Sequence, residues 1–253
     1  MPVGYTRRCC AFIDILGFRD LLRRQSATQL HDILALMRDP PLLRGLGAGL
    51  REHVTISTFS DNICISAAPT YEGVRWLLSV TEQLAHSLLG FGTLLRGAVV
   101  VGELVHDDKV VFGDALVRAY AIESQVAEHP RIVLTREFVE LVHGLMQGGI
   151  AEDPLAPFIA QSVDGPFFLD VLNQMPIRLA DPENGSEWAL RYRQIAELLQ
   201  AELNAAVDNP RHFAKHQWFA QYWNLRLEPG TDAALLIHGP GLPGPSPMVL
   251  PSD

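Results

Sequence analysis

The sequence predicts an α+β fold in which helices pack on one face of a mostly antiparallel sheet. Short apolar or alternating segments, typical of strands, are separated by longer segments with the apolar spacing of helices. Their order is strand, helix, hairpin, helix, hairpin, helix and strand, which is that of a ferredoxin-like core with additions. The chain has 253 residues, of which 48% are hydrophobic, so it is long enough to bury such a core.

Each element is predicted from its local spacing and from the residues that end it. An apolar run broken only by Asp14 predicts a buried first strand. Asp39-Pro40-Pro41 ends the first helix, because proline disfavours helical backbone in the residue before it. Asp114 is expected to cap the helix that follows Gly113. In chain order, the predicted elements are a strand at 9–16, one helix at 19–38, a hairpin at 53–67 turned at 60–62, a helix at 72–89, a hairpin at 94–104 and 109–112, a helix at 114–128, a strand at 131–135, a helix at 136–146 and a hairpin at 158–172.

The last third of the chain has a different pattern. Helical spacing resumes at Ser186, and an aromatic-rich segment at 213–227 follows. Helically spaced aromatic residues favour a core or a dimer seam over a nucleic-acid stacking surface. The residues after Gly239 are rich in proline and glycine. We therefore predict one domain at 1–178, a helical extension at 179–238 and a flexible tail at 239–253.

The charge balance narrows the partners. Lys and Arg number 20 against 29 Asp and Glu, a formal net charge of -9. This argues against binding to nucleic acid or to an anionic membrane, both of which favour a basic face. It still permits a small anionic substrate, because a bound metal can supply positive charge.

The cysteine count and the apolar runs bear on the location of the protein. Three cysteines, two of them adjacent, make no disulfide framework, which favours a reducing cytoplasm. The first eight residues are polar and basic, and no run of about 18 uncharged apolar residues occurs. We therefore expect a cytoplasmic protein.

Three residues could carry chemistry. Asp14 lies in a buried strand, where an ionised carboxylate is costly unless it is paired or binds a metal. Asp61 lies at a hairpin tip, where aspartate also occurs for turn reasons alone, but this hairpin is expected to pair beside the first strand. Two carboxylates brought together in this way can hold two metal ions. Arg96, within an apolar strand, either forms a core ion pair or faces a ligand.

Four segments together resemble class III nucleotidyl cyclases. They are Phe-Ile-Asp-Ile-Leu-Gly-Phe at 12–18, Phe-Ser-Asp-Asn at 59–62, Arg96 to Gly102, and Phe-Gly-Asp-Ala-Leu-Val at 112–117 leading to Glu-Ser at 123–124. Their order and spacing agree over about residues 8–172. The sequences of the first two segments are most similar to those of the small pyrimidine cyclases of the Pycsar antiphage system.

The resemblance implies a catalytic domain at 1–178 and a set of site residues. Asp14, Asp61 and the backbone carbonyl of Ile15 would bind two Mg²⁺ or Mn²⁺ ions. One metal would lower the pKa of the ribose 3′-hydroxyl, and the other would steady the leaving pyrophosphate. The implied substrate-binding residues are Phe12, Gly17, Phe18, Ser57 and Arg96.

Two departures from the family pattern affect the expected activity. The position four residues before Asp61, which helps to read the base, carries Lys or Glu in purine cyclases and is Ser57 here, which argues against ATP and GTP. The positions of the usual transition-state Asn and Arg are Val117 and Ala121, which offer no side-chain hydrogen bond. Arg96 and Arg118 are the candidates to replace them. Arg118 lies about 100° around the helix from Val117, so Arg96 is preferred as the catalytic arginine.

We therefore expect a homodimeric pyrimidine cyclase with sites at the subunit interface. It would convert UTP to cyclic UMP and pyrophosphate, and the cyclic nucleotide would be a defence signal read by a separate effector protein. The alternatives are a cytidylate cyclase, an adenylate cyclase and a non-catalytic interaction module with a cyclase fold.

Overall fold

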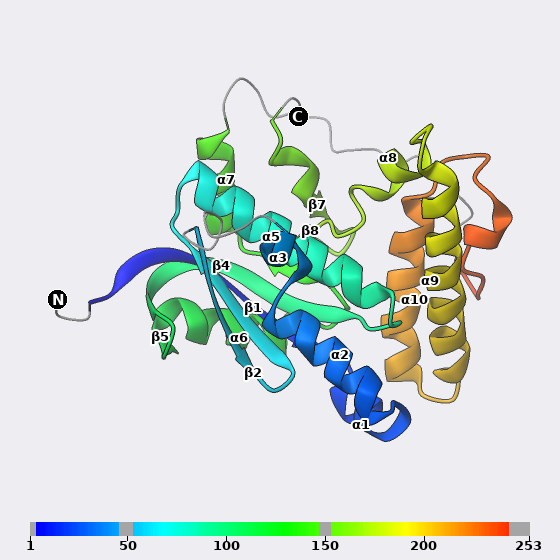
Figure 1. Ribbon diagram of the computed structural model, residues 1–253, viewed down its shortest axis with the longest axis horizontal. Helices are drawn as coiled ribbons and strands as arrows, with labels where there is room; N and C mark the ends of the chain where they lie inside the picture. The colour runs from blue at the N-terminus through cyan, green and yellow to red at the C-terminus, as the bar shows by residue number, and fades with distance from the viewer. Residues whose placement is uncertain (1–3, 46–52, 147–152, 243–253) are drawn as a thin grey trace. The chain divides into compact units, whose positions relative to one another are not determined.

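The computed structural model describes residues 4–45, 53–146 and 153–242, which belong to two compact units (Figure 1). One unit is Met1–Ser87 with Leu94–Asp170, and the other is Leu88–Thr93 with Val171–Asp253. Most of the tail predicted at 239–253 lies outside the described residues. Within those residues, no helix combines the length and the apolar character that a membrane span requires.

The first unit is built on one sheet, which has eight strands within the described residues. The strand order is β2-β3-β1-β4-β6-β8-β7, and β5 pairs with β4 outside this path. Every neighbouring pair is antiparallel except β4 with β6, so the sheet is mixed rather than purely antiparallel. The strands are β1 (Thr6–Ile15), β2 (Val54–Phe59), β3 (Asn62–Ala67), β4 (Leu95–His106), β5 (Val111–Phe112), β6 (Ile132–Leu134), β7 (Ile159–Gln161) and β8 (Phe167–Leu169).

The predicted ferredoxin-like α+β core is confirmed by this strand order. The four strands β2-β3-β1-β4 are all antiparallel, helices α1 and α2 connect β1 to β2, and α5 connects β3 to β4. In Figure 1, α2 and α5 cover one face of the sheet, but α6 lies on the other. The prediction that helices pack on one face only is therefore wrong, because small residues such as Ala115 and Gly102 let α6 pack against the second face. The helices of this unit are α1 (Phe18–Arg24), α2 (Ala27–Arg38), α3 (Pro41–Gly45), α5 (Tyr71–Leu89), α6 (Asp114–Gln125) and α7 (Arg136–Leu145), with a 3-10 turn at Ala156–Phe158.

Helix α6 packs closely on the face of β1 that also carries Asp14. Cys10 and Phe12 on this face form a buried cluster with Ala115 and Ala119 of α6. The close approach depends on small residues: a Cβ added at Gly102 of β4 would lie 3.3 Å from that of Ala115. Since side chains alternate along a strand, Asp14 points toward the same side as Phe12.

Two predictions about helix starts are wrong. The single helix expected at 19–38 is two helices, because Ser26 begins a new one. Its hydroxyl accepts from the Gln29 N–H, and the Gln29 side chain accepts from the Ser26 N–H, which is a capping box. Asp114 is the first residue of α6 and not its cap. The cap position is Gly113, whose φ of 143° favours glycine.

A buried ion pair connects the start of β6 to the β7–β8 turn. Arg131, with 3% of its side chain exposed, donates to both carboxylate oxygens of Asp164 at 2.6 and 2.7 Å. This guanidinium holds the pKa of Asp164 well below its usual value.

We expect Asp164→Ala to lower the free energy of unfolding by about 2 kcal/mol, since it removes a carboxylate from a buried guanidinium. The effect stays below that of a fully buried pair because the Asp164 side chain is 44% exposed. Urea denaturation at pH 7 measures it, with Asp108→Ala in the exposed turn between β4 and β5 as the control. A change below about 0.5 kcal/mol would contradict the role given to this pair.

The second unit is helical and has an aromatic core. Trp223 is buried and donates its indole N–H to the Leu235 carbonyl at 2.8 Å. The Tyr192 ring meets the Trp223 ring edge-on at 5.9 Å. The aromatic residues expected to form a core or a dimer seam therefore contribute to this core. Its helices are α8 (Met175–Leu179), α9 (Gly185–Ala205) and α10 (Pro210–Leu225), with a 3-10 turn at Ala233–Leu235.

Candidate functional site

The structure brings Asp14 and Asp61 to the same end of the sheet. Asp14 is the register partner of Asn62 in β3, and Asp61 occupies the turn immediately before that strand. The turn is tied to β1 because the Ile15 N–H donates to the Asp61 carbonyl at 3.2 Å. The two residues are therefore close along the backbone, and the charge of Asp61 acts on Asp14.

Arg96 is the register partner of Asp14 in β4 and pairs with it. Its Nε and Nη2 lie 3.2 and 3.1 Å from one Asp14 oxygen. The same Nη2 lies 2.7 Å from Glu123 of α6, an ion pair that lacks the geometry of a hydrogen bond. Of the two alternatives that the sequence leaves open for Arg96, the ion pair is the one present in this structure.

The site carries more negative than positive charge. The pKa of Asp14 is raised to about 6, mainly by burial; Arg96 opposes this shift, and the charges of Glu123 and Asp61 add to it. Only 14% of the Asp14 side chain and 4% of the Glu123 side chain are exposed. The Arg96 guanidinium thus pairs with two carboxylates, and the charge of Asp61 also acts on Asp14, so a cation bound at Asp14 would relieve the imbalance.

The donor set suits a divalent cation in its chemistry. Carboxylate and carbonyl oxygens are the ligands that Mg²⁺ and Mn²⁺ prefer. Within residues 4–45, 53–146 and 153–242, no cluster of three or more His, Cys, Asp and Glu side chains forms a metal site from protein alone. Mg²⁺ usually takes one or two protein carboxylates together with water and substrate phosphates, so a pair such as Asp14 and Asp61 fits it.

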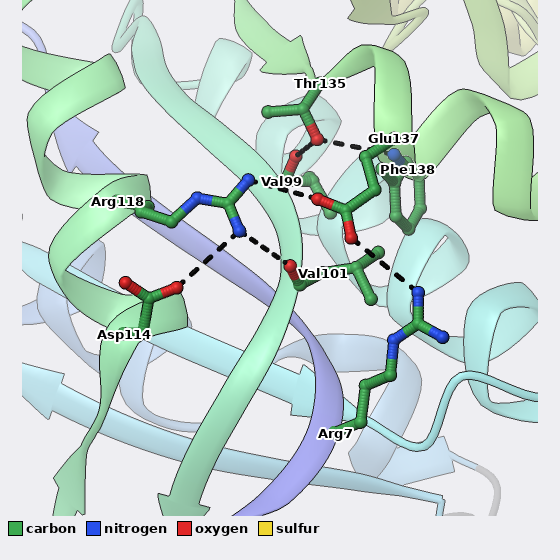
Figure 2. A network of polar contacts seen from close by, with 8 residues as sticks. All are labelled: Arg7, Val99, Val101, Asp114, Arg118, Thr135, Glu137 and Phe138. Carbon is green, nitrogen blue, oxygen red and sulfur yellow. Dashed lines mark hydrogen bonds and ion pairs between the residues drawn. The ribbon is translucent and has the colours of Figure 1, made fainter.

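Arg118, the other arginine considered from the sequence, takes part in a separate network (Figure 2). Its guanidinium donates to the Val101 carbonyl at 3.0 Å and to Glu137 of α7 at 3.1 Å, and it lies 3.6 Å from Asp114. Glu137 also pairs with Arg7 of β1 at 3.6 Å. Arg118 therefore joins α6 to β4 and α7, which supports a structural role.

Ser57 lies in a polar network on the Asp14 face of the sheet. Its hydroxyl is 3.0 Å from Nε2 of His106, whose Nδ1 is 2.7 Å from the Ser66 hydroxyl. Arg8 in turn donates to that hydroxyl at 2.9 Å. Burial, followed by the Arg8 charge, lowers the pKa of His106 to about 4, so the ring is neutral at pH 7.

Phe12, Gly17 and Phe18 lie within four residues of Asp14 in the sequence, and Val117 lies on α6. Phe12 is buried, and its ring meets that of Tyr120 edge-on at 5.7 Å. Gly17 is the cap position of α1, with a φ of 74°, a left-handed conformation that favours glycine, and Phe18 begins the helix. Val117 is 65% exposed on α6.

Sequence reasoning gave no role in the site to two contributors, Glu123 and His106. Glu123 has a recognisable signal, since it continues the buried face of Ala115 and Ala119 at four-residue spacing. An acidic residue at an apolar position of a helix indicates a buried partner. His106 has no comparable local signal, because its contacts come from strands 40 and 49 residues away in the chain.

Comparison with known proteins gives structural likenesses only. No protein-family model and no curated protein matches the chain. Among solved structures, it is similar to the guanylyl cyclase Cya2 (14% identity, 67% of this chain and 93% of that chain, TM-score 0.37). It is also similar to the dimeric guanylyl cyclase domain of the RhoGC fusion protein of the aquatic fungus Blastocladiella emersonii (13% identity, 65% and 93%, TM-score 0.44). A third is the adenylate/guanylate cyclase/hydrolase of Silicibacter pomeroyi (15% identity, 65% and 95%, TM-score 0.38). Because these TM-scores are low, the fold assignment rests on the strand order itself.

Proposed function

We propose that the protein is a metal-dependent pyrimidine nucleotide cyclase that converts UTP to 3′,5′-cyclic UMP and pyrophosphate. The observation that supports the proposal is that Asp14 and Asp61 lie at the same end of β1 and β3, where the charge of Asp61 helps to raise the pKa of Asp14. The sequence resemblance adds the reaction class and a role in antiphage signalling through a separate effector protein, and the cysteine content adds a cytoplasmic location.

Two divalent ions, Mg²⁺ or Mn²⁺, would be held by Asp14, Asp61 and the Ile15 carbonyl. When bound, they would supply positive charge to the triphosphate and lower the pKa of the ribose 3′-hydroxyl. Gly17 and Phe18 lie three and four residues after Asp14, so their backbone would be in reach of the same phosphates.

Arg96 has a second ionic partner, Glu123, which would remain when Asp14 binds a cation. The Arg96–Glu123 contact at 2.7 Å stays available, so the guanidinium remains neutralised and held near Asp14. From this place it would donate to the triphosphate and stabilise charge in the transition state. Arg96 would thereby take over part of the work of the Asn and Arg that are absent at Val117 and Ala121.

We further propose a homodimer in which α6 and β5 contribute to the interface. Both elements expose large apolar side chains, which are costly in water and typical of contact surfaces. Val117 and Tyr120 lie one helical turn apart on α6 and are 65% and 57% exposed, and Phe112 of β5 is 43% exposed. A second copy of the chain would cover them.

Incubation of the purified protein with each of the four nucleoside triphosphates and Mn²⁺ tests the activity. We expect cyclic UMP as the main product, together with pyrophosphate. Cyclic CMP as the main product would make the protein a cytidylate cyclase, and cyclic AMP would make it an adenylate cyclase. Either result would overturn the choice of UTP.

One alternative is a non-catalytic module with the same fold. It is favoured by Val117 and Ala121 and by the ion pair that Arg96 makes with Asp14. If no triphosphate is turned over at any Mn²⁺ or Mg²⁺ concentration, this function replaces the proposed one.

We expect Glu123→Gln to weaken the use of metal by about 10-fold or more. With a neutral residue at position 123, Asp14 is the remaining anionic partner of Arg96. A cation must then compete with a stronger Arg96–Asp14 ion pair. The measurement is turnover as a function of Mn²⁺ concentration, and the half-saturating concentration should rise more than the maximal rate falls. Glu137→Gln, which alters the separate Arg118 network, is the control. An unchanged Mn²⁺ dependence would exclude this role for Glu123.

A further inference from the structure

The hydrogen bonds around Ser57 have a defined order of donors and acceptors, which follows from the groups that can only donate. Arg8 is always charged and has no acceptor, so its Nε must donate to the Ser66 hydroxyl oxygen at 2.9 Å. Its Nη2 donates to Thr55 Oγ1 and to the Ser66 carbonyl, both at 3.2 Å, which keeps the guanidinium in place. Arg8 therefore determines where the hydrogen of Ser66 can go.

The orientation of the Ser66 hydroxyl determines the hydrogen bonds of His106. Its side chain is fully buried, so its single hydrogen needs an acceptor. His106 Nδ1 lies 2.7 Å away and is the acceptor that the described residues offer. A neutral imidazole that accepts at Nδ1 carries its hydrogen at Nε2. The Nε2–H then donates to Ser57, whose oxygen is 3.0 Å away.

This series of hydrogen bonds ends at the hydroxyl hydrogen of Ser57. The Ser57 oxygen already accepts from His106, and within the residues that the structure describes no second partner holds its hydrogen. Ser57 is only partly buried, so a ligand can reach it. The hydroxyl is thus prepared to donate.

We propose that the Arg8–Ser66–His106 relay makes Ser57 a hydrogen-bond donor to the base, and that it selects a carbonyl over an exocyclic amino group. This rests on the proposed function and on the base-reading role that the sequence resemblance implies for Ser57. Uracil presents O4, an acceptor, where cytosine presents an N4 amino group, a donor. The cytosine amino group can only donate to the remaining lone pair of the Ser57 oxygen, which leaves the hydroxyl hydrogen unpaired and costs affinity.

The test compares kcat/KM for UTP and CTP in four variants. We expect the wild type to prefer UTP by about 10-fold or more. Ser57→Ala and His106→Leu should bring the ratio close to one, because the first removes the donor and the second lets the hydroxyl rotate. His106→Gln should keep most of the preference, because its amide can donate to Ser57 from a similar place. Thr58→Ala, an exposed neighbour on β2, should leave the ratio unchanged.

A second measurement does not depend on the variants folding. Nitrogen-15 NMR of His106 in the wild type should show the neutral tautomer with hydrogen on Nε2. The Nδ1–H tautomer, equal use of UTP and CTP, or an unchanged ratio in Ser57→Ala would each overturn the inference while the cyclase activity stands. Absence of turnover with all four nucleotides would instead overturn the proposed function, and the inference with it.

Discussion

Asp14→Ala and Asp61→Ala are each expected to lower the turnover of the preferred nucleotide by at least about 10²–10³-fold. Metal-assisted catalysis contributes several kcal/mol of charge stabilisation, and either change removes half of the paired carboxylates. Turnover of UTP at saturating Mn²⁺, with circular dichroism as a check on folding, measures the effect. Asp32→Ala, an exposed carboxylate on α2, is the matched control and should keep full activity.

Neither variant should unfold the protein. In Asp14→Ala, Arg96 keeps Glu123 as its partner, so no buried cation is left without an anion. In Asp61→Ala, the bond from the Ile15 N–H to the residue 61 carbonyl is a backbone contact and is preserved. Retained activity would refute the metal role, and loss of the folded state at 25 °C would assign the two residues a structural role.

Stability in the absence of divalent metal is expected to contain two opposite pH dependences. The pKa of Asp14 is raised to about 6 in the folded state. The contribution of Asp14 to the free energy of unfolding is therefore complete below about pH 4 and is lost as the pH rises through 6. The pKa of His106 is lowered to about 4, so its contribution is complete above about 6.5 and is lost as the pH falls toward 4. Each amounts to on the order of 3 kcal/mol.

Single variants separate the two contributions. The free energy of unfolding of Asp14→Asn minus that of the wild type should increase between pH 4 and 6. The corresponding difference for His106→Gln should increase as the pH falls from 6.5 to 4. Urea denaturation in EDTA at several pH values measures both, with Asp32→Asn as the control. Differences that stay constant over this range would show that neither group is titrated as described.

Much of the fold follows from local patterns in the sequence. The hairpin at 53–67 is confirmed by β2 and β3, whose two-residue turn at Ser60 and Asp61 has Ser60 at a φ of 58°. The long helix predicted at 72–89 is α5, because a strongly periodic segment specifies its own type. The break at Ser26 was also encoded locally, in Ser-x-x-Gln, and was obscured by the continuous apolar spacing around it.

The sequence by itself determined the order of strands and helices, the ferredoxin-like core and the candidates Asp14 and Asp61, because these depend on short-range spacing and on the cost of a charge in an apolar strand. The tertiary structure alone decided which partners these side chains meet. Strand register joins Asp14 to Arg96 across 82 residues, and the packing of α6 adds Glu123. It likewise brings His106 to Ser57, 49 residues apart. The energy of such ion pairs and hydrogen bonds depends on distance in space, which no local pattern specifies.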